Sequence, residues 1–154
     1  MKLLILPHQL FEINKIKNTL KQLKNITNIS NDIKISDLHF ILWEHPHYFT
    51  HYNFNKKKLV LHRATLKYYE AYLKNKKINQ ITYLDYKNKN KSFLSLLNKD
   101  ESYLIFDPID KIELPDKHII LESPNFLLTK EKYDQYKQKT DKYLFNNFYM
   151  WSNN

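Results

Sequence analysis

The chain has 154 residues, of which 42% are hydrophobic and 15% aromatic, enough to bury the core of one domain and too apolar for a disordered chain. It has no cysteine and no glycine, which excludes disulfides, thiolate catalysis, Fe–S clusters, Walker loops and Gly-x-Gly dinucleotide turns. The net charge is +9 but Arg63 is the only arginine, so the basic surface either binds a polyanion or reflects lysine-rich coding.

Apolar runs, helical spacing and capping residues predict the elements of the chain. In chain order they are a strand over Lys2–Pro7, a helix over Phe11–Lys24, a loop over Asn25–Asp37, a strand over Leu38–Trp43, a helix over Asn55–Asn75, a strand over Ile81–Tyr86, a short helix over Lys91–Leu97, strands over Ser102–Phe106 and Lys117–Glu122, a helix over Lys130–Lys137 capped by Thr129, and a helical aromatic tail over Lys142–Trp151.

Strands that alternate with helices imply a parallel sheet covered on both faces. We therefore predict a single α/β domain over residues 1–154, with a three-layer Rossmann-like or flavodoxin-like fold and a five-stranded parallel sheet. Ligands of such sheets bind outside the carboxyl ends of the strands. This rule selects three loops as candidate ligand contacts, at Pro7–Leu10, Glu44–Asn55 and Asp107–Asp110.

Candidate ligand-binding residues lie in the first two of these loops. His8 and Gln9 either hydrogen-bond a planar ring or form a turn into the first helix. Glu44 either holds a ribose or ribityl hydroxyl or is a surface acid. Tyr48 and its aromatic neighbours either stack on a flat chromophore or base or pack beneath their own loop. The histidines here lack the spacing of a metal site, so we expect no metal.

Basic residues at the start of the second long helix form a second candidate site. Lys56, Lys57 and Lys58 oppose the helix dipole, which favours either an anionic partner such as DNA or simple surface solvation. Arg63 either joins them or forms an ion pair with an acid.

No spacing suggests a catalytic constellation. No apolar run approaches the roughly 20 residues of a membrane helix. The apolar run at the start of the chain is too short for a signal peptide, so we expect a cytoplasmic or nuclear protein that is not secreted.

Several blocks, taken together and in order, resemble the cryptochrome and photolyase-related family. They are Leu4-Ile5-Leu6-Pro7-His8-Gln9-Leu10, Trp43-Glu44, Lys56-Lys57-Lys58 before a long helix, Glu122-Ser123-Pro124-Asn125-Phe126-Leu127-Leu128-Thr129, and Phe148-Tyr149. The family commonly has Gly-Asp-Gln-Leu where this chain has Pro7-His8-Gln9-Leu10, so Gln9 and Leu10 match and the acid is replaced.

The resemblance is to the amino-terminal, antenna-type α/β domain of the family. It implies a flavin or ribityllumazine antenna, with Gln9, Leu10 and Glu44 at positions that match the family. His8 and Tyr48 join them as expected ring contacts because of their place in the strand-end loops. The helical FAD-binding domain of the family, with its Fe–S cysteines and its light-driven DNA repair, is not expected in this chain. We therefore expect a protein that is not catalytic alone and docks to a separate FAD-binding photolyase domain. The alternative is a small basic nucleic-acid-binding protein that uses Lys56, Lys57, Lys58 and Arg63.

Overall fold

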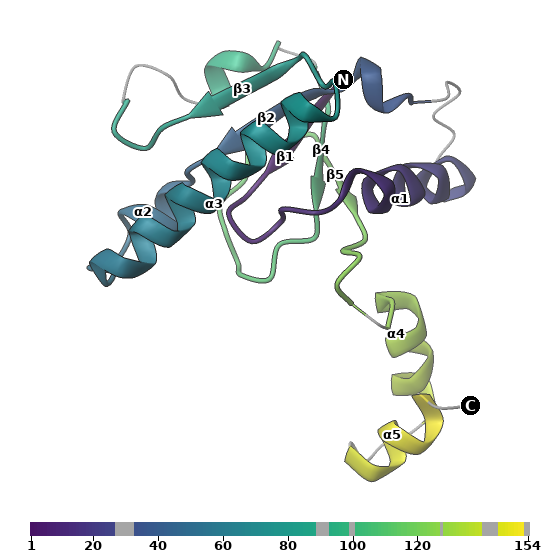
Figure 1. Ribbon diagram of the computed structural model, residues 1–154. Coiled ribbons are helices and arrows are strands. Elements are labelled where there is room, and N and C mark those ends of the chain that lie inside the picture. The colour runs from purple at the N-terminus through teal and green to yellow at the C-terminus, as the bar shows by residue number, and fades with distance from the viewer. Residues whose placement is uncertain (27–32, 89–92, 99–100, 127, 140–144, 153–154) are drawn as a thin grey trace. The chain divides into compact units, whose positions relative to one another are not determined.

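The computed structural model describes residues 1–26, 33–88, 93–98, 101–126, 128–139 and 145–152 (Figure 1). The elements, in chain order, are β1 (Lys2–Ile5), α1 (Ile13–Ile26), the 3₁₀ helix η1 (Ile35–Asp37), β2 (His39–Trp43), α2 (Pro46–Phe49), α3 (Lys56–Asn75), β3 (Ile81–Leu84), the 3₁₀ helix η2 (Phe93–Leu96), β4 (Tyr103–Phe106), β5 (His118–Leu121), α4 (Lys130–Gln138) and α5 (Phe145–Ser152). The chain forms two compact units, residues 1–123 and 124–154.

The five strands form one parallel sheet in the order β3-β2-β1-β4-β5, which confirms the predicted α/β fold. This is the strand order of the Rossmann type, whose order reverses between β1 and β4. Each strand lies within its predicted range, and the three central strands are continuous apolar runs because both of their faces are buried. All four residues of β4 are buried, for example.

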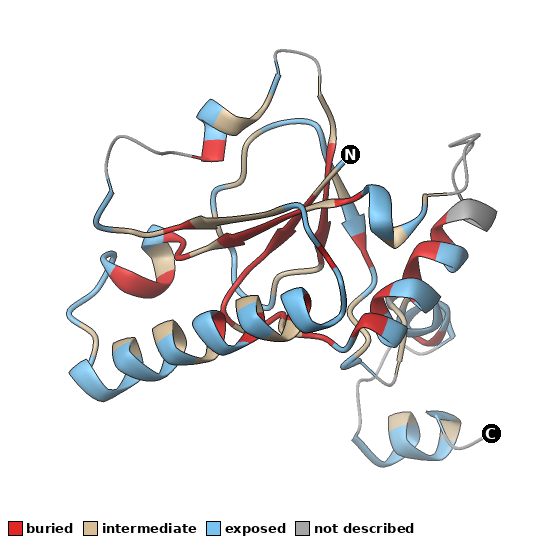
Figure 2. Ribbon diagram, turned by 45° about the horizontal axis from the view of Figure 1, so that its top comes forward, coloured by how far each residue is buried: buried red, intermediate tan, exposed pale blue. Residues whose placement is uncertain are grey.

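The two long helices of this unit, α1 and α3, lie on the same side of the sheet with their buried residues facing it (Figure 2). Leu66 and Leu73 of α3 are fully buried, as is Ile16 of α1. The other face is covered by η2, where Phe93 stacks on Trp43 at 5.3 Å between ring centroids and meets Tyr103 edge-on at 4.7 Å. Both faces of the sheet therefore contribute to one apolar core.

The ends of α3 explain how a chain without glycine terminates a helix. Asn55 caps its start by accepting a hydrogen bond from the Lys57 backbone N–H at 2.8 Å, as the predicted boundary requires. At its end Lys77 adopts φ = 62°, while Lys77 N donates to Lys74 O and Ile78 N donates to Leu73 O. This is the Schellman arrangement, in which the left-handed position is usually glycine. Here a lysine occupies it and bears the steric cost.

One expectation about the strand-end loops differs from the structure, and three predicted elements lie partly outside the described residues. The segment from Glu44 to Asn55 was expected to be a loop, but Pro46–Phe49 form a helical turn with His45 as its N-cap. Proline at the first helical position was the sequence signal for this turn. The predicted elements Asn25–Asp37, Lys91–Leu97 and Lys142–Trp151 include residues 27–32, 91–92 and 142–144, which lie outside the described residues.

The second unit contains α4 and α5. Thr129 caps α4 by accepting from Lys132 N at 3.2 Å, as predicted. Tyr136, which is buried, contacts the rings of Phe148 and Trp151 at 5.2 and 5.1 Å between centroids. In the part of the chain that the structure describes, no helix has both the length and the apolarity needed to cross a membrane.

Candidate functional site

Gln9 ties together the ends of β1 and β4 at the point where the strand order reverses. Its side chain is 1% exposed, its Oε1 accepts from Leu6 N at 3.2 Å, and its Nε2 donates to Phe106 O at 2.7 Å. Both ends of the amide are thus engaged by main-chain groups. Gln9 fixes the path of the loop that follows β1, and so determines where His8 lies.

Glu44, at the end of β2, is fully buried and carries four hydrogen bonds. Arg63 donates through Nε to Oε1 at 2.7 Å and through Nη2 to Oε2 at 2.5 Å, the Tyr83 hydroxyl donates to Oε1 at 2.5 Å, and Tyr86 N donates to Oε2 at 3.1 Å. These bonds use the acceptor sites that a carboxylate offers. The ion pair that the sequence left as an alternative for Arg63 is therefore formed, and it anchors α3 to the end of β2.

Three residues, each with a buried polar atom that lacks a hydrogen-bond partner, line one cavity beside these anchors. The atoms are His8 Nε2 from the β1–α1 loop, Tyr48 Oη from α2 and His62 Nε2 from α3. The cavity has a volume of about 280 Å³, and its other lining residues are His47, Tyr52, Phe54, Lys58, Ile109 and Asp110. We call it the histidine pocket. It lies at the carboxyl ends of the strands, where the sequence placed a ligand site.

Aromatic rings form much of the wall of the histidine pocket. Tyr48 meets His8 edge-on at 5.2 Å between centroids and His62 at 6.4 Å, and the Lys58 ammonium lies 4.4 Å from the centre of the Phe54 ring. Tyr48 was expected either to stack on a ligand or to pack beneath its own loop. Its ring packs against histidine rings on both sides of its loop, and the residue also lines the histidine pocket; stacking on a ligand stays a prediction.

Burial controls the protonation of the pocket. Desolvation lowers the pKa of His8, an effect that Asp110 opposes and His62 reinforces. Desolvation, followed by the charge of Lys58, lowers the pKa of His62. Desolvation and the nearby Asp110 carboxylate raise the pKa of the Tyr48 hydroxyl. At neutral pH His8 and His62 are therefore neutral imidazoles and Tyr48 is a neutral phenol, groups that both donate and accept hydrogen bonds.

The remaining predicted residues lie elsewhere. Leu10 lines a separate cavity of about 310 Å³ between the β1–α1 loop and α3, together with Phe11, Glu12, Thr65, Tyr68, Tyr69 and Tyr72. Lys56 and Lys57 are exposed at the start of α3, whereas Lys58 also reaches the histidine pocket. The four basic residues proposed to bind nucleic acid therefore do not form one site. Arg63 pairs with Glu44, Lys58 lines the histidine pocket, and the other two lie on the surface.

Sequence reasoning did not commit to His62 or Asp110 as site residues. Asp110 lies in the loop after β4, which the strand-end rule had selected, so a signal was present. His62 lies within α3, and nothing in the helix itself distinguishes it. Among the described side chains, no three histidine, aspartate or glutamate residues are arranged to hold a metal ion.

Comparison with known proteins supplies two matches. A sequence model of the deoxyribodipyrimidine photo-lyase-related protein family matches residues 3–119, a range that includes all the residues lining the histidine pocket. An uncharacterized protein of Acanthamoeba polyphaga mimivirus is 29% identical over 164 aligned positions, which cover 96% of this chain and 78% of that relative. No solved structure matches the chain.

Proposed function

The chain belongs to the deoxyribodipyrimidine photolyase-related protein family, and from that membership we propose that it binds a flavin- or lumazine-like ring in the histidine pocket, as an antenna-type domain. In this proposal the bound ring absorbs light and passes the excitation to a separate FAD-binding photolyase domain. The link to light-dependent DNA repair or photoreception then depends on that partner, and this chain is not catalytic by itself.

The observation that carries the proposal is the group of three unpaired polar atoms, His8 Nε2, Tyr48 Oη and His62 Nε2, around one aromatic cavity. A buried polar group without a partner costs about 1–3 kcal/mol. Three such groups on residues that line one cavity are costly in the free protein, and a ligand that reaches them and supplies their partners would recover this cost. Flavin and lumazine rings offer carbonyl oxygens and ring nitrogens in one plane, which suits these three atoms and the aromatic walls.

The size of the cavity favours a small ring system. At about 280 Å³ it lies just below the range of roughly 300–1,000 Å³ typical of ligand pockets. A bicyclic lumazine suits this volume better than a complete dinucleotide such as FAD. Gln9 and Glu44 contribute by position, since one fixes the loop that carries His8 and the other anchors α3 beside His62.

The test is an absorbance and fluorescence titration of the purified chain with ribityllumazine and with FAD, repeated with Tyr48→Phe. Removing the unpaired hydroxyl should leave the free protein as stable or more stable, and should weaken ring binding by about tenfold, the worth of one hydrogen bond. Tyr68→Phe is the matched control, because Tyr68 is 77% exposed on α3 and lines the other cavity. It should leave both properties unchanged.

Two outcomes would reject this function. One is the absence of saturable binding of either compound by the unmodified chain. The other is a Tyr48→Phe protein that loses stability but keeps full affinity, since the hydroxyl would then have a structural partner. The role of the partner is tested separately, by adding an FAD-loaded photolyase domain to the ring-bound chain and measuring quenching of the ring fluorescence.

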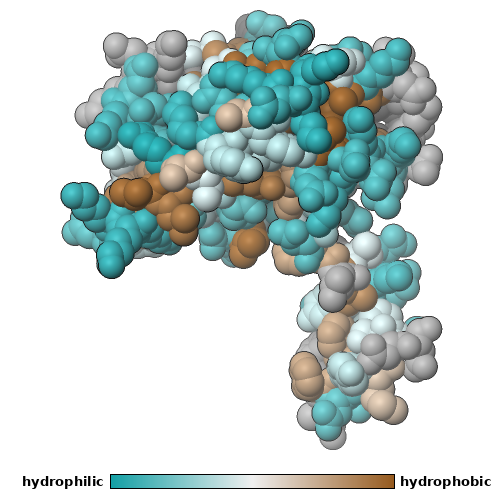
Figure 3. Space-filling model, in the orientation of Figure 1, coloured by the Kyte–Doolittle hydropathy of each residue, from teal (hydrophilic) through white to brown (hydrophobic). Residues whose placement is uncertain are grey.

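A second candidate function is nucleic-acid binding, and the residues that favour it are Lys56 and Lys57. Both are exposed in the first turn of α3, which has no acidic residue. Figure 3 shows the face that contains α3 as largely hydrophilic, with apolar patches. Binding through these lysines would be independent of sequence and strongly weakened by salt, because it would rest on phosphate contacts. Arg63 is engaged by Glu44 and would contribute little.

A further inference from the structure

The helix α3 has two uncharged sides, and the sheet covers only one of them. Its buried residues, Leu66, Tyr69 and Leu73, face the sheet, while the side of the helix that points away from the sheet is exposed along its length (Figure 2). Outside the contact with the sheet, a second row of uncharged residues follows helical spacing, and we call it the outer stripe. The outer stripe consists of Leu61, Ala64, Thr65, Tyr68, Ala71 and Tyr72.

The outer stripe has the spacing of a surface on which a second helix packs. Leu61, Ala64, Tyr68 and Ala71 are three and four residues apart, which is the repeat of paired helices. Leu61 is 61% exposed, Tyr68 is 77% exposed, and both alanines are exposed as well. Because large and small residues alternate, the alanines leave hollows for the side chains of a partner. From its first to its last residue the stripe is about 17 Å long, or three helical turns.

The polar groups of the outer stripe are engaged within the chain itself. Thr65 Oγ1 donates to the Leu61 carbonyl oxygen at 2.9 Å, and the Tyr72 hydroxyl accepts from Ile13 N at 3.2 Å. What the stripe offers to a partner is therefore mainly methyl groups and ring surface. Such a surface suits the apolar side of another helix rather than a small polar ligand.

The cavity of about 310 Å³ between the β1–α1 loop and α3 lies beside the outer stripe. Three of its seven lining residues, Thr65, Tyr68 and Tyr72, belong to the stripe, and Glu12 is the only charged residue among the seven. A hollow of this size and character accepts one large apolar side chain. Amphipathic helices are held in grooves by such side chains, which project from one side of the helix.

Basic residues surround the outer stripe. Over residues 56–77 the chain carries eight basic residues and a single acid, Glu70. Lys67 and Lys74 both pair with that acid, at 3.2 and 2.8 Å. Arg63, Lys67 and Glu70 are four and three residues apart, so they form a separate row along α3 and leave the stripe free of charge. A partner with acidic residues beside its apolar side complements these charges, whereas a second copy of this chain would bring like charges together.

We propose that the outer stripe of α3 binds an amphipathic helix of a partner protein, in which acidic residues flank the apolar row. The apolar row packs between Leu61 and Tyr68, and one large side chain from it fills the adjacent cavity. No residue of the stripe or of this cavity lines the histidine pocket, so this surface and ring binding are independent.

The test uses a fluorescein-labelled designed peptide of about three heptads, with leucine at the a and d positions and glutamate at e and g. Its fluorescence anisotropy should rise and saturate as the unmodified chain is added. The double variant Leu61→Ser, Tyr68→Ser should bind at least about tenfold more weakly, because it removes the two largest contacts. Tyr68→Phe keeps the ring and should bind as the unmodified chain does. A peptide with lysine at e and g should not bind.

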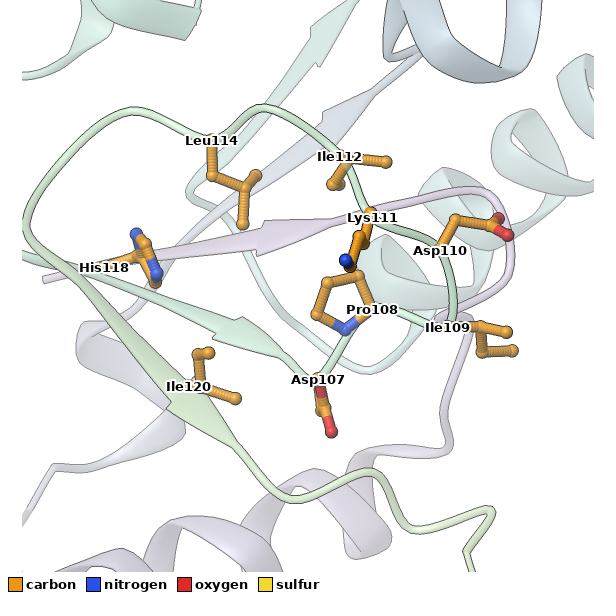
Figure 4. A pocket seen from close by; sticks show the side chains of 9 residues that line it. All are labelled: Asp107, Pro108, Ile109, Asp110, Lys111, Ile112, Leu114, His118 and Ile120. Atoms are coloured by element: carbon orange, nitrogen blue, oxygen red, sulfur yellow. The ribbon is translucent and has the colours of Figure 1, made fainter.

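An exposed isoleucine on another surface provides the matched control. Ile109 is 69% exposed and lines a cavity of about 410 Å³ between the β4–β5 loop and β5 (Figure 4). The lining of that cavity includes the acids Asp107 and Asp110, which do not complement an acidic helix. Ile109→Ser should therefore leave peptide binding unchanged. Thermal unfolding curves that match that of the unmodified chain establish that the variants are folded.

Several results would overturn this assignment. If the acidic peptide fails to bind, or the basic peptide binds equally well, the partner does not have the stated charge. Full affinity in the Leu61→Ser, Tyr68→Ser variant would mean that the peptide contacts the lysines alone. Self-association of the unmodified chain that this variant abolishes would make a second copy the occupant of the stripe. DNA binding that the variant abolishes would make nucleic acid the occupant.

Discussion

Arg63 holds the fully buried carboxylate of Glu44 through two hydrogen bonds, from Nε to Oε1 at 2.7 Å and from Nη2 to Oε2 at 2.5 Å. The guanidinium also reaches Asp85 Oδ1 at 2.5 Å, and its side chain is 33% exposed. The pair joins the end of β2 to α3 at the residue next to His62. Arg63, the only arginine of the chain, therefore helps to fix the position of α3 and of His62 beside the histidine pocket.

Replacing Glu44 with glutamine should destabilise the protein by about 3 kcal/mol, because it removes one partner of a pair whose acid is fully buried. Urea unfolding followed by circular dichroism measures this loss. Glu70→Gln is the matched control, since Glu70 pairs with Lys74 at i,i+4 on the exposed side of α3 and should cost less than about 1 kcal/mol. Equal losses in the two variants would show that the Glu44–Arg63 pair stabilises the protein no more than an exposed ion pair does.

Gln9 should be more important for stability than its position in a loop suggests. Gln9→Leu leaves the buried Phe106 carbonyl and Leu6 N–H without their side-chain partner, which should cost about 1–3 kcal/mol. The same change at Gln22, which is exposed on α1, should alter the free energy of unfolding by no more than about 0.5 kcal/mol. Denaturant midpoints of the two variants, at equal m-values, decide the comparison.

Lys77, at the end of α3, has a left-handed backbone conformation whose steric cost a substitution can remove. Lys77→Gly should stabilise the protein by about 1 kcal/mol, because glycine adopts φ = 62° without a Cβ clash. The same change at Lys74, inside the last turn of α3, should destabilise it by about 1 kcal/mol. Thermal unfolding of both variants tests this. A loss of stability in Lys77→Gly would mean that its side chain makes contacts worth more than the strain.

Stability should fall as the pH is lowered below about 6.5, the ordinary pKa of histidine. Desolvation lowers the pKa of His8, His39, His45 and His62 in the folded protein. The unfolded chain then binds more protons than the folded one, so the free energy of unfolding decreases with falling pH through the folded pKa values. This stability is fully present above the ordinary histidine pKa.

Unfolding measured at intervals between about pH 5 and 7 isolates the histidines, since carboxyl groups titrate mostly below that window. A double variant, His8→Gln with His62→Gln, should show a shallower dependence than the unmodified chain. A double variant with the full slope would assign the acid sensitivity to groups outside the histidine pocket.

Substituting the lysines at the start of α3 tests helix stability and nucleic-acid binding separately. Lys56→Glu with Lys57→Glu should stabilise the helix by about 0.3–1 kcal/mol per residue, because acids favour the positive end of the helix dipole. If the chain binds DNA there, the same variant should lose that binding. The matched change at Lys74 and Lys76, at the other end of α3, should lower stability and retain binding. Salt titrations of DNA affinity for both variants provide the measurement.

Much of the fold was predictable because its elements carry local signals. Continuous apolar runs located all five strands, and Asn55 and Thr129 marked the starts of α3 and α4 through their capping side chains. The turn at Pro46–Phe49 was missed because its signal, a proline at the first position, was outweighed by the polar and aromatic residues around it. These are short-range effects, and a single sequence contains them.

The site was only partly predictable, because its residues are brought together by long-range packing. The strand-end rule located the edge of the sheet, and His8 and Tyr48 line the pocket there. It could not show that Gln9 would bond to a carbonyl 97 residues away, or that Glu44 and Arg63 would neutralise each other.

The sequence by itself determined the strands, the long helices and the edge of the sheet at which a ligand site was expected, since each follows from local periodicity and capping. Only the tertiary structure decided the strand order and which polar groups are paired. Glu44 and Gln9 became anchors, whereas His8, Tyr48 and His62 were left with unpaired polar atoms around one cavity. The physical reason is that the partner of a polar side chain is set by neighbours distant in the chain, which local periodicity and capping do not specify.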